Sequence, residues 1–218
     1  MKPSRRPPRP IAFQGTSLDD LRAFPPGPRR EAGHQLDRVQ HGLDPDDWKP
    51  MPNVGPSVRE MRVRDEAGAF RAIYTAIRPE AVYVLHAFQE KAPQAAKRDL
   101  DLAKARSWEL VRRGFVTEAA DDTPGEVFAS VWDALEDSPA AAVNMRVRSG
   151  LMTAVQEAVA GWGLTPVEAA RRLDVTQPRL DDLLRGRVGR FGLDALILLA
   201  TRAGLSVRVQ VDRTEAAA

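Results

Sequence analysis

Apolar and polar residues follow a strand-like pattern in three short runs within the first half of the chain. These runs occupy residues 58–64, 70–77 and 81–88, and turn-forming residues separate them. Apolar side chains at every second position are typical of strands that bury one face. Because the runs follow one another closely, the pattern predicts a three-stranded antiparallel meander.

A helical period of apolar positions flanks this meander on both sides. It predicts a short helix with Ser17 as its N-cap, a second helix after residues 25–28, and a third from about Gln94 to Arg113. The first part of the chain therefore combines helices with a sheet.

A polar, acidic segment at residues 114–126 contains both Pro and Gly, which is typical of a linker. The chain has 218 residues, of which 43% are hydrophobic, and this is enough for two small domains. We therefore expect an N-terminal half of residues 1–113 and a C-terminal half of residues 127–218, each with its own core.

Helical patterns dominate the C-terminal half. They occupy residues 127–137, 145–161, 166–172, 177–185 and 193–203. At the end of the chain, the alternating valines of residues 206–211 predict a short strand. The expected fold class is α+β, with an antiparallel sheet and its helices followed by an all-α helix-turn-helix bundle and a short terminal strand.

Two short helices within residues 164–187 have the spacing of a helix-turn-helix. Thr165 and Thr176 each stand at an N-cap position before a proline, and only a tight turn fits between the helices. The second helix of such a unit enters the DNA major groove by its N-terminal end. The candidates for base edges are Thr176, Gln177 and Arg179, and the candidates for phosphates are Arg185, Arg187 and Arg190. The alternative is a small helical bundle without DNA binding, because capped amphipathic helices occur there too.

Charge is distributed unevenly along the chain. Residues 1–114 contain 21 Lys/Arg and 15 Asp/Glu, whereas residues 115–218 contain 11 and 15. A basic module favours a polyanion such as nucleic acid, and an acidic module on the same chain is a candidate competitor for it. The acidic amphipathic helix predicted at 127–137 is short for an independent unit, so we expect it to dock. Its candidate docking residues are Val131, Trp132 and Leu135.

Residue usage excludes several kinds of chemistry. The chain has no cysteine and only three scattered histidines, which excludes a disulfide framework, a thiol nucleophile and a cysteine-bound zinc. No apolar run approaches the length of a membrane span, and the basic N-terminus leads into no apolar signal segment. We therefore expect a cytoplasmic protein with no cofactor, no metal site and no membrane contact.

Two family resemblances lie on these segments. Residues 127–211 resemble helix-turn-helix antitoxins of the HigA kind, on VTQPRLDDLLRG and on the preceding VWDALEDSP helix. The chain from about Ile11 to Arg106 resembles HigB-type toxins of the RelE-like superfamily, in its phage-related branch, on SLDDLRAFP, DRVQ, DWKPMPNVG, VREMRVRD, GAFRAIY and VYVLHAFQEK. The second resemblance implies a toxin with two helices on an antiparallel sheet that cleaves messenger RNA, usually on the ribosome.

Metal-free RNA cleavage uses the 2′-hydroxyl as its nucleophile. The site must take up that proton, stabilise an overcharged phosphate and protonate the leaving oxygen. We expect Arg62 and Arg71 to clamp the phosphate and Lys91 to neutralise the transition state. Tyr74 and His86 are expected to transfer protons or to stack on a base. The full set of candidate catalytic residues is Glu60, Arg62, Arg71, Tyr74, His86 and Lys91.

Plainer interpretations apply to the same residues. Arginines on one strand face usually form a solvated surface, and His86 lies in an apolar strand, where a core histidine is common. Glu90 stands beside Lys91, where related toxins commonly carry another lysine. A carboxylate at that position would damp the local charge or mark a disarmed copy.

Together these features predict a fused toxin and antitoxin that is inhibited by default. A tether of about a dozen residues gives an effective concentration around millimolar. The expected partners are messenger RNA and the ribosome, operator DNA for autorepression, and the other half of the same chain or of a second copy. The alternative is a non-enzymatic DNA-binding transcription regulator with a degenerate toxin-like module, and a further one is a protein-binding adaptor with neither activity.

Overall fold

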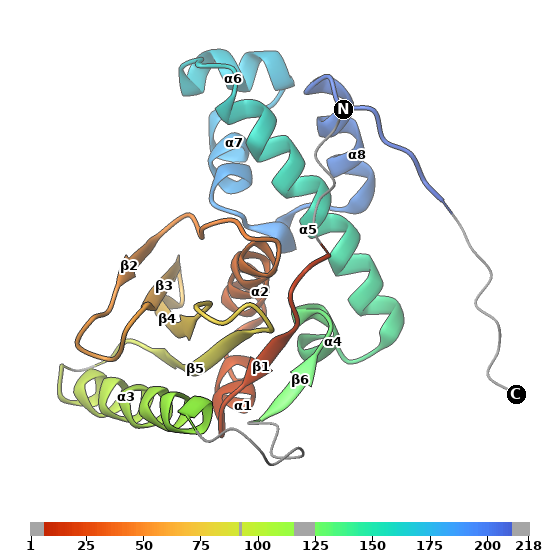
Figure 1. Cartoon of the computed structure of the whole chain (residues 1–218). Helices are drawn as coiled ribbons and strands as arrows, with labels where there is room; N and C mark the ends of the chain where they lie inside the picture. The colour runs from red at the N-terminus through yellow and green to blue at the C-terminus, as the bar shows by residue number, and fades with distance from the viewer. Residues whose placement is uncertain (1–6, 92, 116–124, 211–218) are drawn as a thin grey trace, which may run out of the picture.

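The structure is a computed structural model that describes residues 7–91, 93–115 and 125–210. Figure 1 shows a sheet with helices in the N-terminal half and a group of helices in the C-terminal half. The elements of the N-terminal half are β1 (Ile11–Phe13), α1 (Ser17–Arg22), α2 (Pro26–Gln40), β2 (Trp48–Pro50), β3 (Val58–Asp65), β4 (Gly68–Thr75), β5 (Val82–Gln89) and α3 (Pro93–Phe115). The predicted meander is confirmed as β3, β4 and β5, and the α+β fold class is confirmed.

The sheet has six strands in the order β2-β3-β4-β5-β1-β6. Strand β1 is parallel to β5 and the other neighbouring pairs are antiparallel, so the sheet is mixed rather than wholly antiparallel. The outer strand β6 (Glu126–Phe128) comes from the end of the expected linker and the start of the C-terminal half, and it pairs Phe128 with Ile11. The second half of the chain thus completes the sheet of the first.

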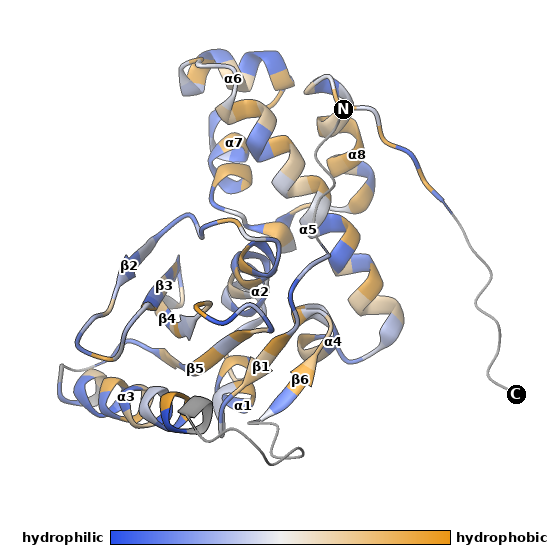
Figure 2. Ribbon diagram, in the orientation of Figure 1, coloured by the Kyte–Doolittle hydropathy of each residue, from blue (hydrophilic) through white to orange (hydrophobic). Residues whose placement is uncertain are grey.

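Helices cover both faces of the sheet. Helix α3 packs against β5 on one face, and α1 and α2 pack against β5 and β3 on the other. Strand β5 is buried over almost its whole length because it lies inside the sheet with helices on both sides. Figure 2 shows the contrast between β5, which is largely hydrophobic, and the outer strand β2, which is largely hydrophilic.

The start of the first helix differs from the expectation. Thr16 occupies the N-cap position, and Ser17 is the first residue of α1. The Ser17 hydroxyl donates to the carbonyl oxygen of Val84 on β5 at 3.0 Å. A buried hydroxyl needs a hydrogen-bond partner, and here the sheet supplies it. The prediction that Ser17 caps this helix was therefore wrong.

The C-terminal half is helical after β6. Its elements are α4 (Val131–Leu135), α5 (Pro139–Ala160), α6 (Pro166–Leu173), α7 (Gln177–Leu184), the 3₁₀ helix η1 (Val188–Arg190) and α8 (Leu193–Arg202). The helix expected at 127–137 is shorter, because its first residues join the sheet. The terminal strand was predicted wrongly for residues 206–210, which form no strand and are mostly exposed, while residue 211 lies outside the described residues.

One hydrophobic cluster extends through both halves. It includes Ile11, Leu36 and Val63 from the first half and Trp132, Met152 and Leu180 from the second. The halves therefore share a core, in place of the two separate cores that the linker composition suggested. None of the helices in the described ranges is long and apolar enough to span a membrane.

Candidate functional site

The candidate catalytic residues of the first half gather around Glu60. Its side chain is fully buried on β3 and accepts a hydrogen bond from Arg62 Nε at 2.8 Å. Arg71 Nη1 on β4 donates to both Glu60 carboxylate oxygens at 2.8 Å, and Lys49 Nζ lies 3.5 Å from Oε1. A buried carboxylate is stable only when it is paired, and the three cations supply that pairing for Glu60. The strand pairing explains the geometry, since Arg62 lies directly opposite Arg71.

Arg71 has a second carboxylate partner. Its Nε donates to Glu90 Oε2 at 3.1 Å, just after β5. The hydrogen bond from Arg71 lowers the pKa of Glu90, so this carboxylate stays ionised at neutral pH. A phosphate that approaches Arg71 must therefore compete with Glu90 for the guanidinium. Lys91, the next residue, is exposed.

The remaining candidates lie apart from this cluster. Tyr74 is fully buried in the core, and burial raises the pKa of its hydroxyl. His86 is also buried, with Nδ1 at 3.0 Å from Asp20 Oδ2 and Nε2 at 3.0 Å from Asp99 Oδ1. Both ring nitrogens are thus occupied, and the imidazole joins α1 to α3 across β5. These contacts favour the interpretation of His86 as a satisfied core histidine.

Sequence reasoning missed Lys49, which the short strand β2 places beside Glu60. The only available signal was its position inside DWKPMPNVG, one of the segments that carry the toxin resemblance. Lys49 is the third residue of this segment, and the segment has neither a strand-like nor a helical period. Its contact with Glu60 therefore appears only in the folded sheet.

The helix-turn-helix lies in α6 and α7. Thr165 and Glu168 form the expected capping box of α6, and Thr176 accepts a hydrogen bond from the Arg179 backbone at the start of α7. Asp174 makes the turn between the helices in the left-handed region, with φ 53° and ψ 53°. Asp tolerates this conformation better than most residues, so the tight turn fits its sequence.

The predicted base-reading residues stand at the N-terminal end of α7, which is far from the sheet in Figure 1. Thr176 and Gln177 are exposed. The Arg179 guanidinium lies 3.8 Å above the centre of the Phe191 ring and donates to the Arg190 carbonyl at 2.9 Å. Arg179 is thus held against Phe191 and would have to leave that ring to reach a base.

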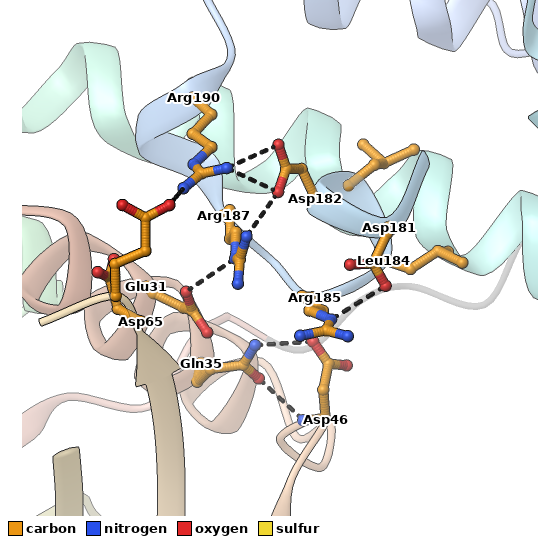
Figure 3. Close-up of polar contacts among 12 residues, drawn as sticks. Glu31, Gln35, Asp46, Asp65, Asp181, Asp182, Leu184, Arg185, Arg187 and Arg190 are labelled. Atoms are coloured by element: carbon orange, nitrogen blue, oxygen red, sulfur yellow. Dashed lines mark hydrogen bonds and ion pairs between the residues drawn. The ribbon is translucent and has the colours of Figure 1, made fainter. Parts of the chain in front are cut away.

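The predicted phosphate contacts lie at the other end of α7, beside the N-terminal half. Figure 3 shows Arg187 between Asp182, at 2.8 Å, and Glu31 of α2, at 3.9 Å. Arg190 also binds Asp182, at 3.1 Å. Arg185 pairs with Asp181 at 3.0 Å. In this arrangement all three arginines are engaged with carboxylates rather than free for phosphates.

The neighbouring acidic residues Asp181 and Asp182 have different surroundings. Asp181 is exposed and makes an i,i+4 pair with Arg185, whereas the side chain of Asp182 is only 14% exposed and binds Arg187 and Arg190. Asp182 fixes the turn that follows α7, a role that periodicity alone did not reveal.

A depression of about 320 Å³ separates the two candidate sites. Arg62 and Arg64 of β3 line it on one side, and Leu184 and Arg185 line it on the other. The C-terminal end of α7 thus approaches the edge of the Glu60 cluster.

The predicted docking residues are buried between the halves. Trp132 is 0% exposed and Leu135 is 3% exposed, and a Cβ built on Gly33 of α2 would lie 2.9 Å from both side chains. The absence of a side chain at Gly33 is what allows α4 to approach α2 so closely. Gln40 of α2 also accepts a hydrogen bond from Val131 N at 2.9 Å.

Among the residues that the structure describes, no group of histidine, cysteine and acidic side chains has the geometry of a metal site.

Two protein-family models match different parts of the chain. Residues 19–107 match the family model of phage derived Gp49-like proteins, and residues 134–212 match that of a helix-turn-helix domain. No curated protein matches the chain. The chain is similar to Gp49-like proteins over its sheet and to helix-turn-helix domains over its helical half, and the combination supports a toxin–antitoxin-like fusion.

Proposed function

We propose that the chain is a self-inhibited toxin–antitoxin fusion of the HigB and HigA kind, in which the second half restrains the first and binds operator DNA to repress its own gene. The N-terminal half is then a metal-independent endoribonuclease that acts on messenger RNA at the ribosome. The C-terminal half supplies both the restraint and the DNA contact, and a second copy of the chain binds the other half of a two-fold operator.

The proposed restraint of the first half by the second rests on one observation. The C-terminal half is built into the N-terminal half, because β6 extends its sheet and α4 buries Trp132 and Leu135 in the shared core. At the same time the N-terminal end of α7, with Gln177, stays exposed. A chain in this state has the β1 edge and the α2 face of its first half covered, and the N-terminal end of α7 remains exposed.

The proposed chemistry rests on the Glu60 cluster. Arg62 and Arg71 are the cations that would hold a phosphate, and Glu60 orients both of them. A carboxylate that accepts several hydrogen bonds also has the capacity to take up a proton from a 2′-hydroxyl, provided that the substrate displaces one of its partners. Lys91 would add positive charge near the leaving group.

A specific observation favours the alternative of a DNA-binding regulator with a degenerate toxin-like module. Glu60 and Glu90 both engage Arg71, and a phosphate must displace at least one of these carboxylates before this residue can bind RNA. Under this alternative the first half serves only to hold the helix-turn-helix in place.

The test combines two assays on the full chain. Restraint is released by Trp132→Ala with Leu135→Ala, which removes two buried side chains worth about 1.5–3 kcal/mol each. We expect this variant to cleave messenger RNA on ribosomes and the unchanged chain to leave it intact, while both retain binding to the DNA upstream of the gene. DNA binding without cleavage in the released variant supports the regulator alternative, and the absence of both activities contradicts the fusion proposal.

A further inference from the structure

The recognition helix α7 ends in a contact with a side chain of α5. Gln156 Nε2 donates to the carbonyl oxygen of Leu183 at 2.9 Å and to that of Leu184 at 3.2 Å. The last carbonyls of a helix have few partners within the helix, so an outside donor at this point fixes where the helix ends and how it is directed. Gln156 is only 6% exposed, so water does not replace it.

Gln156 is in turn held by the N-terminal half. Its Oε1 accepts a hydrogen bond from Arg38 Nη1 of α2 at 2.7 Å and lies 3.4 Å from His34 Nε2. A guanidinium only donates and a backbone carbonyl only accepts, so the amide can satisfy both sides in one orientation only. Arg38 therefore determines which way the Gln156 donors point.

The rest of the contact between α2 and the end of α7 is equally close. Gly186, in the turn after α7, has φ +69°, and a Cβ there would lie 2.6 Å from His34 Cδ2 and 2.7 Å from Gln35 Nε2. His34 Nδ1 is hydrogen-bonded to Ser149 Oγ of α5 at 2.8 Å. Buried and fully paired polar networks of this kind specify one geometry, because each unpaired member costs free energy.

We infer that Gln156 is a positioning residue for DNA reading, through which Arg38 of the N-terminal half sets the direction of the recognition helix. The inference rests on the proposed DNA-binding function and adds a role for the toxin-like half in it. Helix α7 has 8 residues. Because such a helix is ~12 Å long, a tilt of about 10° at its C-terminal end displaces Gln177 by roughly 2 Å, which breaks hydrogen bonds to base edges.

The test measures sequence discrimination by the full chain. Gln156→Leu removes the donors to α7, and Arg38→Met removes the group that orients them. We expect the ratio of affinities for the DNA upstream of the gene and for unrelated DNA of equal length to fall about tenfold in both variants. Affinity for the unrelated DNA and its salt dependence should stay unchanged, because they depend on phosphate contacts. Arg38→Lys, which keeps a cationic donor group, should retain part of the discrimination.

The matched control is Arg22→Met. Arg22 Nε donates to the carbonyl oxygen of Ala134 at 2.9 Å, so it joins the halves without contacting α7. We expect this variant to discriminate as the unchanged chain does, even if its unfolding midpoint falls as much as that of Gln156→Leu. If Gln156→Leu does not fold, Gln156→Glu keeps the acceptor for Arg38 and loses the donors to α7, and it should show the same loss of discrimination.

Hydrogen exchange at residues 181–187 without DNA measures whether the end of α7 is loosened, independently of DNA binding. We expect faster exchange there in Gln156→Leu and Arg38→Met but not in Arg22→Met. Undiminished discrimination in both α7-linked variants overturns the inference while leaving the proposed function intact. If the unchanged chain does not distinguish the two DNAs, the proposed DNA-binding function is overturned. Faster exchange in Gln156→Leu and Arg38→Met would then show that the contact holds α7 even though the DNA-binding function fails.

Discussion

Glu31 is a carboxyl group enclosed where the two halves meet. It lies on α2 with Arg187 at 3.9 Å, and its side chain is 11% exposed. Burial raises its pKa from 4.5 to about 7, against the opposing effect of Arg187, while Asp65 and Asp46 raise it further. The folded chain therefore binds this proton more tightly than the unfolded chain. Its contribution to stability is fully present below about pH 4.5 and is lost as the pH rises through about 7.

The corresponding prediction concerns Glu31→Gln, which stays neutral at every pH. We expect the free energy of unfolding of the unchanged chain to fall relative to that of the variant by up to about 3 kcal/mol between about pH 5 and pH 8. Urea unfolding at several pH values measures this difference. Asp37, whose pKa is also raised by burial, is present in both chains and cancels. Parallel stability curves for the two chains would show that the pKa of Glu31 is the same in the folded and unfolded chains.

Glu90 gives a second prediction at the scale of a single residue. It holds Arg71 through a charge-assisted hydrogen bond, so Glu90→Gln should release the guanidinium for a phosphate. We expect RNA affinity of the released chain carrying Trp132→Ala and Leu135→Ala to rise about tenfold, the worth of one such bond. Glu80→Gln, at an exposed carboxylate away from Arg71, is the control. Equal affinities in the Glu90 and Glu80 variants would remove Arg71 from the RNA site.

At the scale of elements, two glycines in helix interiors form a natural comparison. A Cβ on Gly33 of α2 would meet the Trp132 ring and Leu135 at 2.9 Å, whereas a Cβ on Gly150 of α5 would meet nothing within 4 Å. Alanine has a helix propensity about 1 kcal/mol better than glycine. We therefore expect Gly150→Ala to stabilise the chain by about 0.5–1 kcal/mol and Gly33→Ala to destabilise it by about 1–3 kcal/mol, because the rigid indole must move. Thermal unfolding of both variants measures the contrast, and stabilisation by Gly33→Ala would mean that α4 does not dock as described.

The recognition helix offers a second comparison between its two ends. Gln177 is exposed at the start of α7, and Arg185 follows its last turn. We expect Gln177→Ala to cost about 1–3 kcal/mol against the preferred sequence only, because glutamine reads adenine directly. Arg185→Ala should weaken binding to all sequences and lower the salt slope by about one unit. Salt titrations of DNA binding for both variants distinguish these roles, and identical behaviour would mean that neither assignment holds.

Elements with a long periodic pattern were predictable from sequence, and short ones were not. Strands β3 to β5 and helices α6 and α7 emerged because each repeats its apolar spacing several times or carries a proline-containing cap. Strand β6 has three residues, and its partner β1 lies more than a hundred residues away, so no local sequence pattern predicts this strand. The terminal valines alternate like a strand, but at residues 206–210 no neighbouring strand pairs with them.

At the scale of the whole molecule, the sequence indicated which residue types the candidate site would contain but not which side chains would contact one another. The predicted meander places Arg62 and Arg71 on neighbouring strands, and the register of the folded sheet sets them opposite each other. The pairing of Arg71 of β4 with the buried Glu60 of β3, and the approach of Arg187 to Glu31 and of Arg190 to Glu66, join different segments of the chain, and the last two contacts join the two halves. Charge counts indicated that the halves attract, yet they could not show that the arginines of the DNA-reading half face acidic residues of the basic half.

The shared core leads to a prediction about the separated halves. Residues 1–113 lack β6 and α4, so the outer edge of β1 and the α2 surface that covers Trp132 become exposed, and the Glu60 cluster loses the neighbouring end of α7. We expect expression of this fragment to arrest growth, and expression of the full chain to leave growth unaffected. The fragment carrying Arg71→Ala should be harmless while keeping the circular dichroism of the unchanged fragment.

Because β6 and α4 contribute buried contacts and not merely a tether, residues 125–218 supplied as a separate chain should restore growth and copurify with the fragment. Growth arrest by the full chain would contradict restraint in cis, and a soluble, folded but harmless fragment would leave DNA binding as the activity of this protein.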